Sequence, residues 1–136
     1  MAANALADSS FLVALLNGND TDHAWAATQA THFPPPWKTC EAVLSEAFYL
    51  LGPAGMTAFA ELLHAKAIVC EFEIAGHLEE VLRLLKKYDN VPMSFADTCL
   101  VRMTELLPNP IVLTTDSDFH VYRRHSRQVV PCVTPR

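Results

Sequence analysis

The fold of this chain is indicated first by residues 4–16, NALADSSFLVALL. The apolar residues at the start predict a short buried strand over 4–8, and Ser9 is a suitable N-cap for a helix that continues to Leu16. Asp8 therefore stands at the carboxyl end of the predicted strand. A second stretch, IVLTTDSDF at residues 111–119, repeats the arrangement, since an apolar run predicts a strand and Asp116 follows it.

Between these two stretches the apolar pattern alternates between strand and helix. We expect further strands at 37–39, 67–70 and 129–133, and helices at 20–29, 40–51, 55–65, 75–88 and 94–107. In the 75–88 helix the expected inner face consists of Leu78, Val81, Leu82 and Leu85. Helices between strands act as crossover connections, which predicts an α/β fold with a central, mostly parallel sheet. The ligand site of such a sheet lies beyond the carboxyl ends of its strands.

Length and composition limit the classes of protein to consider. The 136 residues are enough for one domain, which we expect to span residues 1–136. Hydrophobic residues make up 51% and charged residues 18%, so the chain can bury a core and is not expected to be disordered. The formal net charge of −5 argues against a basic protein that coats nucleic acid.

The charge is distributed unevenly along the chain. Residues 81–136 contain 8 basic and 5 acidic side chains, whereas residues 1–80 contain 2 basic and 10 acidic ones. Arg123, Arg124 and Arg127 lie close together in the later part. This cluster is either a surface that faces an anion or an ordinary solvated surface.

The cysteines and the N-terminus indicate a cytoplasmic protein. The four cysteines form no C-x-x-C pair and have no histidine partners at zinc-ligand spacing, so we expect reduced thiols. The first ten residues lack the features of a secretory signal. No uninterrupted apolar run has the length of a membrane span, so no membrane partner is expected.

Two further acids lie near the buried side of predicted helices. Glu46 lies in the apolar stripe of the 40–51 helix, and Asp97 shares a helix face with Leu100 and Val101. An isolated buried charge is costly, so such acids are normally paired or bind a cation.

Each acid also has a purely structural interpretation. Asp8 is suited to a turn before the first helix, and Asp116 to the N-cap of a short helix. Asp97 follows Ser94 by three residues, which is the spacing of a capping box. Glu46 would be exposed if the phase of its helix differed from the prediction.

Four converging acids would fit one kind of chemistry. Mg²⁺ and Mn²⁺ prefer hard oxygen ligands, and carboxylates that repel one another are stabilised when a cation neutralises them. A bound metal lowers the pKa of a water, directs it at phosphorus and stabilises charge on the leaving oxygen. The acids therefore suggest metal-assisted hydrolysis of a phosphodiester, which needs no Ser, His or Cys nucleophile.

Four segments, in this order, resemble the PIN domain family and in particular its small single-domain toxins of the VapC type. They are LADSSFLVALL at residues 6–16, TCEAVLSEAFYLL at 39–51, MSFADTCLVRM at 93–103 and IVLTTDSDF at 111–119. The resemblance covers nearly the whole chain. It implies a three-layer α/β/α sandwich around a parallel sheet, and a Mg²⁺- or Mn²⁺-dependent endoribonuclease.

The resemblance also implies roles for individual residues. The acids expected to be catalytic and to bind metal in one pocket are Asp8, Glu46, Asp97 and Asp116. Asp8 and Asp97 are expected to bind the metal directly, and the other two directly or through water. Thr114 is expected to orient a carboxylate or a water. Asp118 is expected to support the metal ligands without binding the metal itself.

The family resemblance implies partners as well. Toxins of this type are usually homodimers inhibited by a cognate antitoxin protein, so we expect a homodimer, an antitoxin and an RNA substrate. We expect Arg123, Arg124 and Arg127 to contact RNA phosphates beside the acids. The main alternative is a catalytically silent PIN-like protein-interaction module, although such a module would not need all four acids. A phosphoryl-transfer receiver domain is less consistent, because no acid is adjacent to Asp8 and no lysine follows residue 87.

Overall fold

Five parallel strands form the central sheet, in the order β3-β2-β1-β4-β7. They are β1 (Asn4–Ala7), β2 (Trp37–Thr39), β3 (Ile68–Cys70), β4 (Pro110–Leu113) and β7 (Cys132–Val133). The first strand is central, and its Leu6 pairs with Lys38 on one side and with Val112 on the other. The structure is a computed structural model, and it describes residues 2–136. The parallel sheet expected from the alternating pattern is confirmed.

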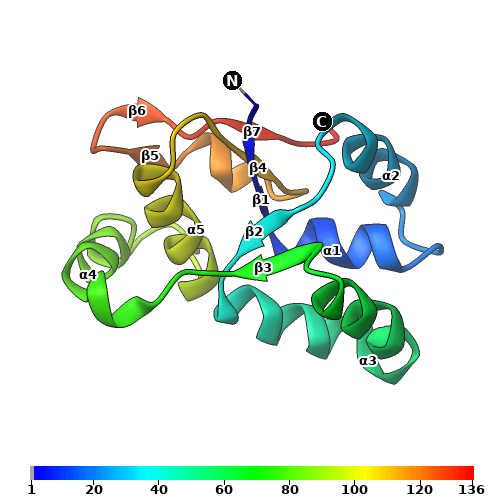
Figure 1. Cartoon of the computed structure of the whole chain (residues 1–136). Helices are drawn as coiled ribbons and strands as arrows, with labels where there is room; N and C mark the ends of the chain where they lie inside the picture. The colour runs from blue at the N-terminus through cyan, green and yellow to red at the C-terminus, as the bar shows by residue number, and fades with distance from the viewer. Residues whose placement is uncertain (1) are drawn as a thin grey trace.

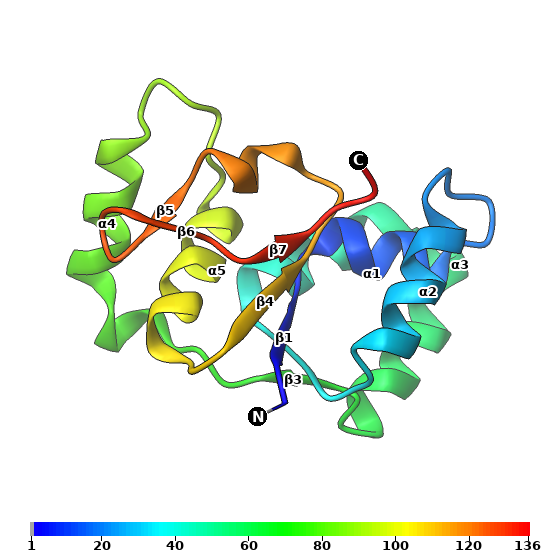
Figure 2. The same ribbon diagram turned by 90° about the horizontal axis from the view of Figure 1, so that it is seen from above.

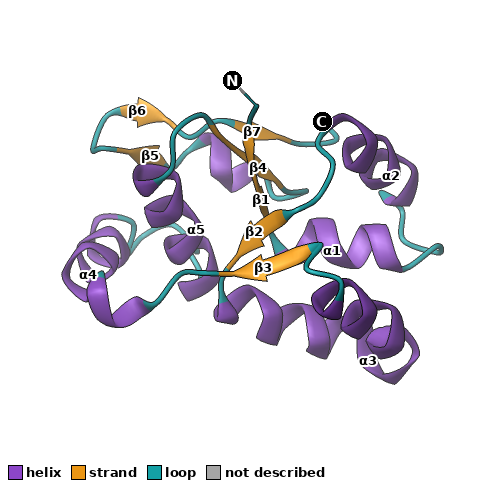
Figure 3. Cartoon of the chain, in the orientation of Figure 1, coloured by secondary structure: helices purple, strands orange, loops and turns teal. Residues whose placement is uncertain are grey.

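Helices cover both faces of this sheet (Figures 1 and 2). One layer consists of α1 (Ser9–Leu16), α2 (His23–His32) and α3 (Glu41–His64), and the other of α4 (Leu78–Lys87) and α5 (Phe95–Leu106). Two short 3-10 helices, η1 (Ile74–Gly76) and η2 (Ser117–His120), lie in the connections. Figure 3 shows the alternation of strand and helix that produces the three-layer α/β/α arrangement. This architecture is the one that the sequence predicts.

The core consists of apolar side chains on both faces of the sheet. On the side of α1, the ring of Phe11 makes edge contacts with Trp25 and Trp37, at centroid distances of 6.2 and 5.5 Å. On the side of α5, Leu100 and Tyr122 are fully buried. A parallel sheet that is covered on both faces needs such continuous apolar strands, which explains the runs in the sequence.

The backbone of α3 is interrupted at Gly52, where φ is 64° and ψ is −170°. Pro53 follows, so the helices expected at 40–51 and 55–65 are two segments joined at a kink. Among the described residues, α3 is the one helix whose length and composition would allow it to cross a membrane, with a mean hydropathy of 1.2. The sequence prediction did not join its two segments. One side of α3 packs against α1, and Val43, Ala47 and Phe59 enter the core.

Two sequence predictions about packing and pairing are wrong in part. Of the expected inner face of α4, Val81 is buried and Leu85 packs against the core, but Leu78 and Leu82 are 48% and 49% exposed and Leu84 is buried in their place. The strand expected at 129–133 is also divided, since Pro131 separates two short strands.

These short strands pair in different sheets. The first, β6 (Gln128–Val129), pairs antiparallel with β5 (Arg123–Arg124) in a hairpin, while β7 joins the parallel sheet beside β4. Proline has no backbone N–H for a ladder hydrogen bond, so it marks the point where the chain changes partner.

Candidate functional site

The carboxyl ends of β1 and β4 place Asp8 and Asp116 at the same edge of the sheet. Ala7 pairs with Leu113, and the backbone N–H of Asp8 donates to the carbonyl of Leu113 at 3.1 Å. Asp8 is only 4% exposed, whereas Asp116, three residues past the end of β4, is half-buried. The strand register therefore brings together two acids that are 108 positions apart in the sequence.

Asp8 is held by three hydrogen bonds. The backbone N–H of Ser9 donates to Oδ1 at 2.8 Å, and Oδ2 accepts from the hydroxyls of Thr114 at 2.7 Å and Ser10 at 3.2 Å. Asp8, rather than the expected Ser9, is thus the N-cap of α1, because its backbone is extended and its carboxylate accepts from the first helical N–H, that of Ser9.

Thr114 links the two strand-end acids. Its fully buried hydroxyl donates to Asp8 and accepts from the backbone N–H of Asp116 at 2.9 Å. Asp116 in turn caps η2 by accepting from the backbone N–H of Asp118 at 2.9 Å. The N-cap interpretation of Asp116 therefore holds, and only one of its oxygens is used in that role.

Asp97 lies in the first turn of α5 and is 6% exposed. Its backbone N–H donates to the Ser94 hydroxyl at 3.0 Å, and its Oδ2 accepts from the Ser94 N–H at 3.5 Å, so the expected capping box is present. The hydroxyl of Tyr122 donates to the same oxygen at 2.9 Å. Oδ1 of Asp97 takes part in none of these bonds.

The electrostatics show that the acids are neighbours. Burial raises the pKa of Asp8 despite its three hydrogen bonds, and the charge of Glu46 raises it further. Burial and the charge of Asp97 raise the pKa of Glu46, while a hydrogen bond to Ser9 opposes that rise. Burial, followed by the charge of Asp8 and to a lesser extent that of Asp116, raises the pKa of Asp97 to about 6. Each of the four predicted acids therefore acts on at least one other.

This donor set fits a hard divalent cation by its chemistry. Within residues 2–136, no group of three His, Cys, Asp or Glu side chains already stands in ligating position. The four acids nevertheless offer only carboxylate oxygens. Burial, and after it the repulsion between neighbouring carboxylates, raises the pKa values of Asp8, Glu46 and Asp97, and a bound cation would relieve that repulsion. Mg²⁺ and Mn²⁺ match such ligands, and Mg²⁺ commonly binds through one or two carboxylates and several waters.

The three arginines of the basic cluster, Arg123, Arg124 and Arg127, lie in different surroundings. Arg123 donates from Nη1 to the carbonyls of His120, Val121 and Tyr122, between 2.9 and 3.2 Å. Arg124 donates to the carbonyl of Thr104.

Arg127 differs from these two. It is exposed at the turn of the β5–β6 hairpin, and no side-chain bond is recorded for it within the described part of the chain. Arg127 is therefore the member most available to an external anion.

Three residues that support the acids were not predicted from the sequence to belong to the site. Ser9 and Ser10 follow Asp8 directly, so their place in the D-S-S triplet was an available signal. Tyr122 had no such signal, because it lies 25 positions from Asp97 and its role depends on how the chain returns over α5.

The chain is similar to known proteins in sequence and in fold. A model of the PIN domain matches residues 5–124. Among solved structures, the chain is similar to the Mycobacterium tuberculosis toxin VapC20, described as a sarcin-ricin loop cleaving toxin. The TM-score is 0.76 at 25% sequence identity, covering 86% of this chain and 93% of that one. No curated protein matches the sequence significantly.

Proposed function

The chain belongs to the PIN domain family, and on that premise we propose that it is a divalent-metal-dependent endoribonuclease, the toxin of a toxin–antitoxin pair. The observation that supports this most is the convergence of Asp8, Glu46 and Asp97, each of which raises the pKa of another. The similarity to a toxin described as cleaving the sarcin-ricin loop supports RNA as the substrate class.

The four acids have distinct roles in this proposal. Asp8 and Asp97 bind Mg²⁺ or Mn²⁺ directly, and Glu46 and Asp116 complete the pocket. When bound, the metal activates a water for attack on phosphorus and stabilises charge on the leaving oxygen. Thr114 holds Asp8 in one orientation through the 2.7 Å hydrogen bond and sets the position of Asp116 through its backbone.

The rival function is a catalytically silent interaction module. Such a protein would keep like charges buried together with no cation to offset them, which is costly for stability. Structural capping accounts for one oxygen of Asp97 and one of Asp116, but it does not account for the proximity of Glu46. The nuclease proposal explains why all of these acids share one edge of the sheet.

The proposal includes two protein partners and a compartment. An antitoxin would cover the acidic pocket, and a second copy of the chain would form a homodimer in the cytoplasm.

The exposed apolar residues of α3 support this helix as the dimer surface. Tyr49 is 87% exposed, and Leu50 and Met56 are also exposed. Leu50→Asp is expected to convert a dimer to monomers in light scattering, whereas the exposed Glu61→Gln is not.

RNA phosphates are proposed to meet the basic cluster of Arg123, Arg124 and Arg127. Arg127 contributes most in this proposal, since the other two guanidinium groups are already bonded to backbone carbonyls. Each arginine that binds a phosphate adds to the salt dependence of RNA affinity.

Mn²⁺ binding by the purified protein tests the function. Wild-type protein is expected to bind Mn²⁺, and Asp97→Asn to abolish or strongly weaken binding. Glu61→Gln, a matched change at an exposed acid of α3, is expected to bind like wild type. RNA cleavage that requires Mn²⁺ or Mg²⁺ and stops in EDTA or with Asp97→Asn would establish the activity. Mn²⁺ binding that survives Asp97→Asn unchanged would place the metal elsewhere and contradict the proposal.

A further inference from the structure

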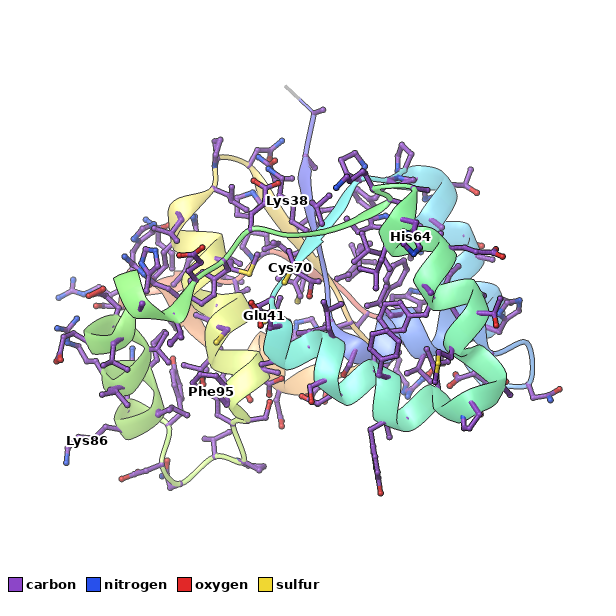
Figure 4. The ribbon with its side chains drawn as sticks, turned by 60° about the horizontal axis from the view of Figure 1, so that its bottom comes forward. Lys38, Glu41, His64, Cys70, Lys86 and Phe95 are labelled. Atoms are coloured by element: carbon purple, nitrogen blue, oxygen red, sulfur yellow. The ribbon has the colours of Figure 1, made fainter. Side chains whose placement is uncertain are left out.

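A hollow lies between the beginnings of α3 and α5, and we call it the α3–α5 hollow. Its volume is about 270 Å³, and its walls include the apolar side chains of Ala42, Phe72, Ile74 and Phe95, together with Glu41 and Glu73. Figure 4 shows Glu41 and Phe95 in the central part of the view, where these two helices come together. The residues of this hollow are not among the predicted catalytic acids.

The hollow adjoins the acidic site because the same two helices form both. Ala42 lies four residues before Glu46, on the same side of α3 and about 6 Å away along the helix axis. Phe95 is the first residue of α5, and Asp97 follows in the same turn. The hollow therefore lies about one helical turn from Glu46 along α3, and it shares the first turn of α5 with Asp97.

Phe95 is the unusual residue of this region. The residue is 47% exposed, although the three residues that follow it, including Asp97, are buried. Phe72 on the opposite wall is buried and stacks on His77 at a centroid distance of 5.1 Å. Phe72 thus has a partner within the protein, whereas much of the Phe95 ring faces outward. Exposed aromatic faces of this kind are the platforms on which proteins stack unpaired bases.

We propose that the α3–α5 hollow binds one unpaired nucleobase of the RNA substrate, stacked against Phe95, while a neighbouring phosphate lies at the acids. This inference rests on the proposed ribonuclease function. The apolar walls suit the faces of a base, and the carboxylates of Glu41 and Glu73 suit its N–H groups. The same carboxylates repel phosphate, so the sugar–phosphate backbone remains outside.

The carboxylates also favour one base over the others. Guanine presents two adjacent N–H donors on its Watson–Crick edge, which is the arrangement that one carboxylate accepts in a bidentate manner. Uracil presents a single N–H donor between two carbonyl oxygens, and those oxygens would face the negative charges. Guanine is therefore the preferred occupant.

RNA binding in EDTA tests the proposal without cleavage. The probes are a fluorescent single-stranded uridine heptamer and the same heptamer with one central guanosine. The full-length protein is expected to bind the guanosine heptamer more tightly than the uridine heptamer. Phe95→Ala is expected to weaken guanosine binding about tenfold, as loss of one stacked base does. Phe95→Trp keeps an aromatic ring and is expected to bind the guanosine heptamer about as tightly as wild type. Glu41→Gln is expected to reduce the preference for guanosine.

Leu106→Ala is the matched control, since Leu106 is an exposed apolar residue at the other end of α5. It is expected to bind both heptamers like wild type, and thermal melting checks that every variant is folded. Equal affinity of wild type and Phe95→Ala for the guanosine heptamer would overturn the nucleobase site. If those variants also cleave RNA with Mn²⁺, the proposed function stands without it. Failure of wild type to bind or cleave any RNA would overturn both.

Discussion

The hydroxyl of Tyr122 donates a 2.9 Å hydrogen bond to Oδ2 of Asp97, so a residue just after η2 holds an acid in the first turn of α5. Both side chains are buried, and this bond opposes the rise in the pKa of Asp97 that burial causes. Burial, and after it the negative charge of Asp97, raises the pKa of Tyr122, so the phenol remains a donor. Tyr122 is a positioning residue for the proposed metal site.

Tyr122→Phe tests this relationship through metal binding. Loss of the hydrogen bond is expected to raise the pKa of Asp97 above about 6 and to lower Mn²⁺ affinity about tenfold, the usual effect of losing an outer hydrogen bond to a ligand. Because the metal needs the ionised carboxylate, the loss should be larger at pH 6 than at pH 8. Titrations with Mn²⁺ at both pH values measure this. The same small loss at both pH values would indicate that Tyr122 only fills space.

The pH dependence of stability tests the electrostatics of Asp97. Its pKa rises from 3.8 to about 6 on folding, so between these pH values the folded protein binds more protons than the unfolded chain. The stability contributed by the protonated group is therefore complete below pH 3.8 and is lost as pH rises through about 6. Denaturant unfolding in EDTA should show this decrease.

Asp97→Asn cannot ionise and should remove that part of the decrease. Relative to wild type, its free energy of unfolding is expected to rise by about 2 kcal/mol between pH 4 and pH 7. The half-buried Asp118→Asn is the control and should follow the wild-type curve. Identical curves for Asp97→Asn and wild type would mean that folding does not raise the pKa of Asp97.

Thr114→Val tests the link between the two strand-end acids. The substitution leaves the shape nearly unchanged but removes the donor to Asp8 and the acceptor of the Asp116 N–H. We expect a loss of about 1–3 kcal/mol of stability, because buried polar groups lose their partner. We also expect weaker Mn²⁺ binding, since the pKa of Asp8 rises when the Thr114 bond is lost. Thr115→Val changes a half-buried neighbour and should affect both measurements little.

The arginines of the β5–β6 hairpin should separate into structural and binding roles. Arg124 donates to the Thr104 carbonyl and, at 3.3 Å, to the side chain of Gln128, so Arg124→Ala is expected to cost about 1–3 kcal/mol of stability. Arg127→Gln should change stability by less than about 0.5 kcal/mol.

RNA affinity measured against salt distinguishes the two substitutions. Arg127→Gln should lower the salt slope of log affinity by about 1. A salt slope that does not change in this variant would remove Arg127 from the RNA surface.

Much of the architecture could be predicted from local pattern. Short apolar runs separated by helix-length segments were sufficient to predict the parallel sheet, because each strand must be apolar on both faces. Gly52 and Pro53 were sufficient to predict the break in α3. The inner face of α4 was predicted correctly at Val81 and Leu85 but wrongly at Leu78 and Leu82, because leucines occupy both sides of that helix and only the neighbouring elements decide which side is buried.

The sequence by itself determined where Asp8 and Asp116 stand, because acids that follow a buried strand by one to three residues lie near the carboxyl edge of a parallel sheet. It also determined the capping box at Ser94, since that contact spans one helical turn. The resemblance led us to expect that Thr114 orients a carboxylate or a water, but only the tertiary structure decided that its partner is Asp8 and that Tyr122 reaches Asp97. These two bonds join distant positions, so they exist only once the strand register and the packing of the last segment over α5 bring the partners within reach.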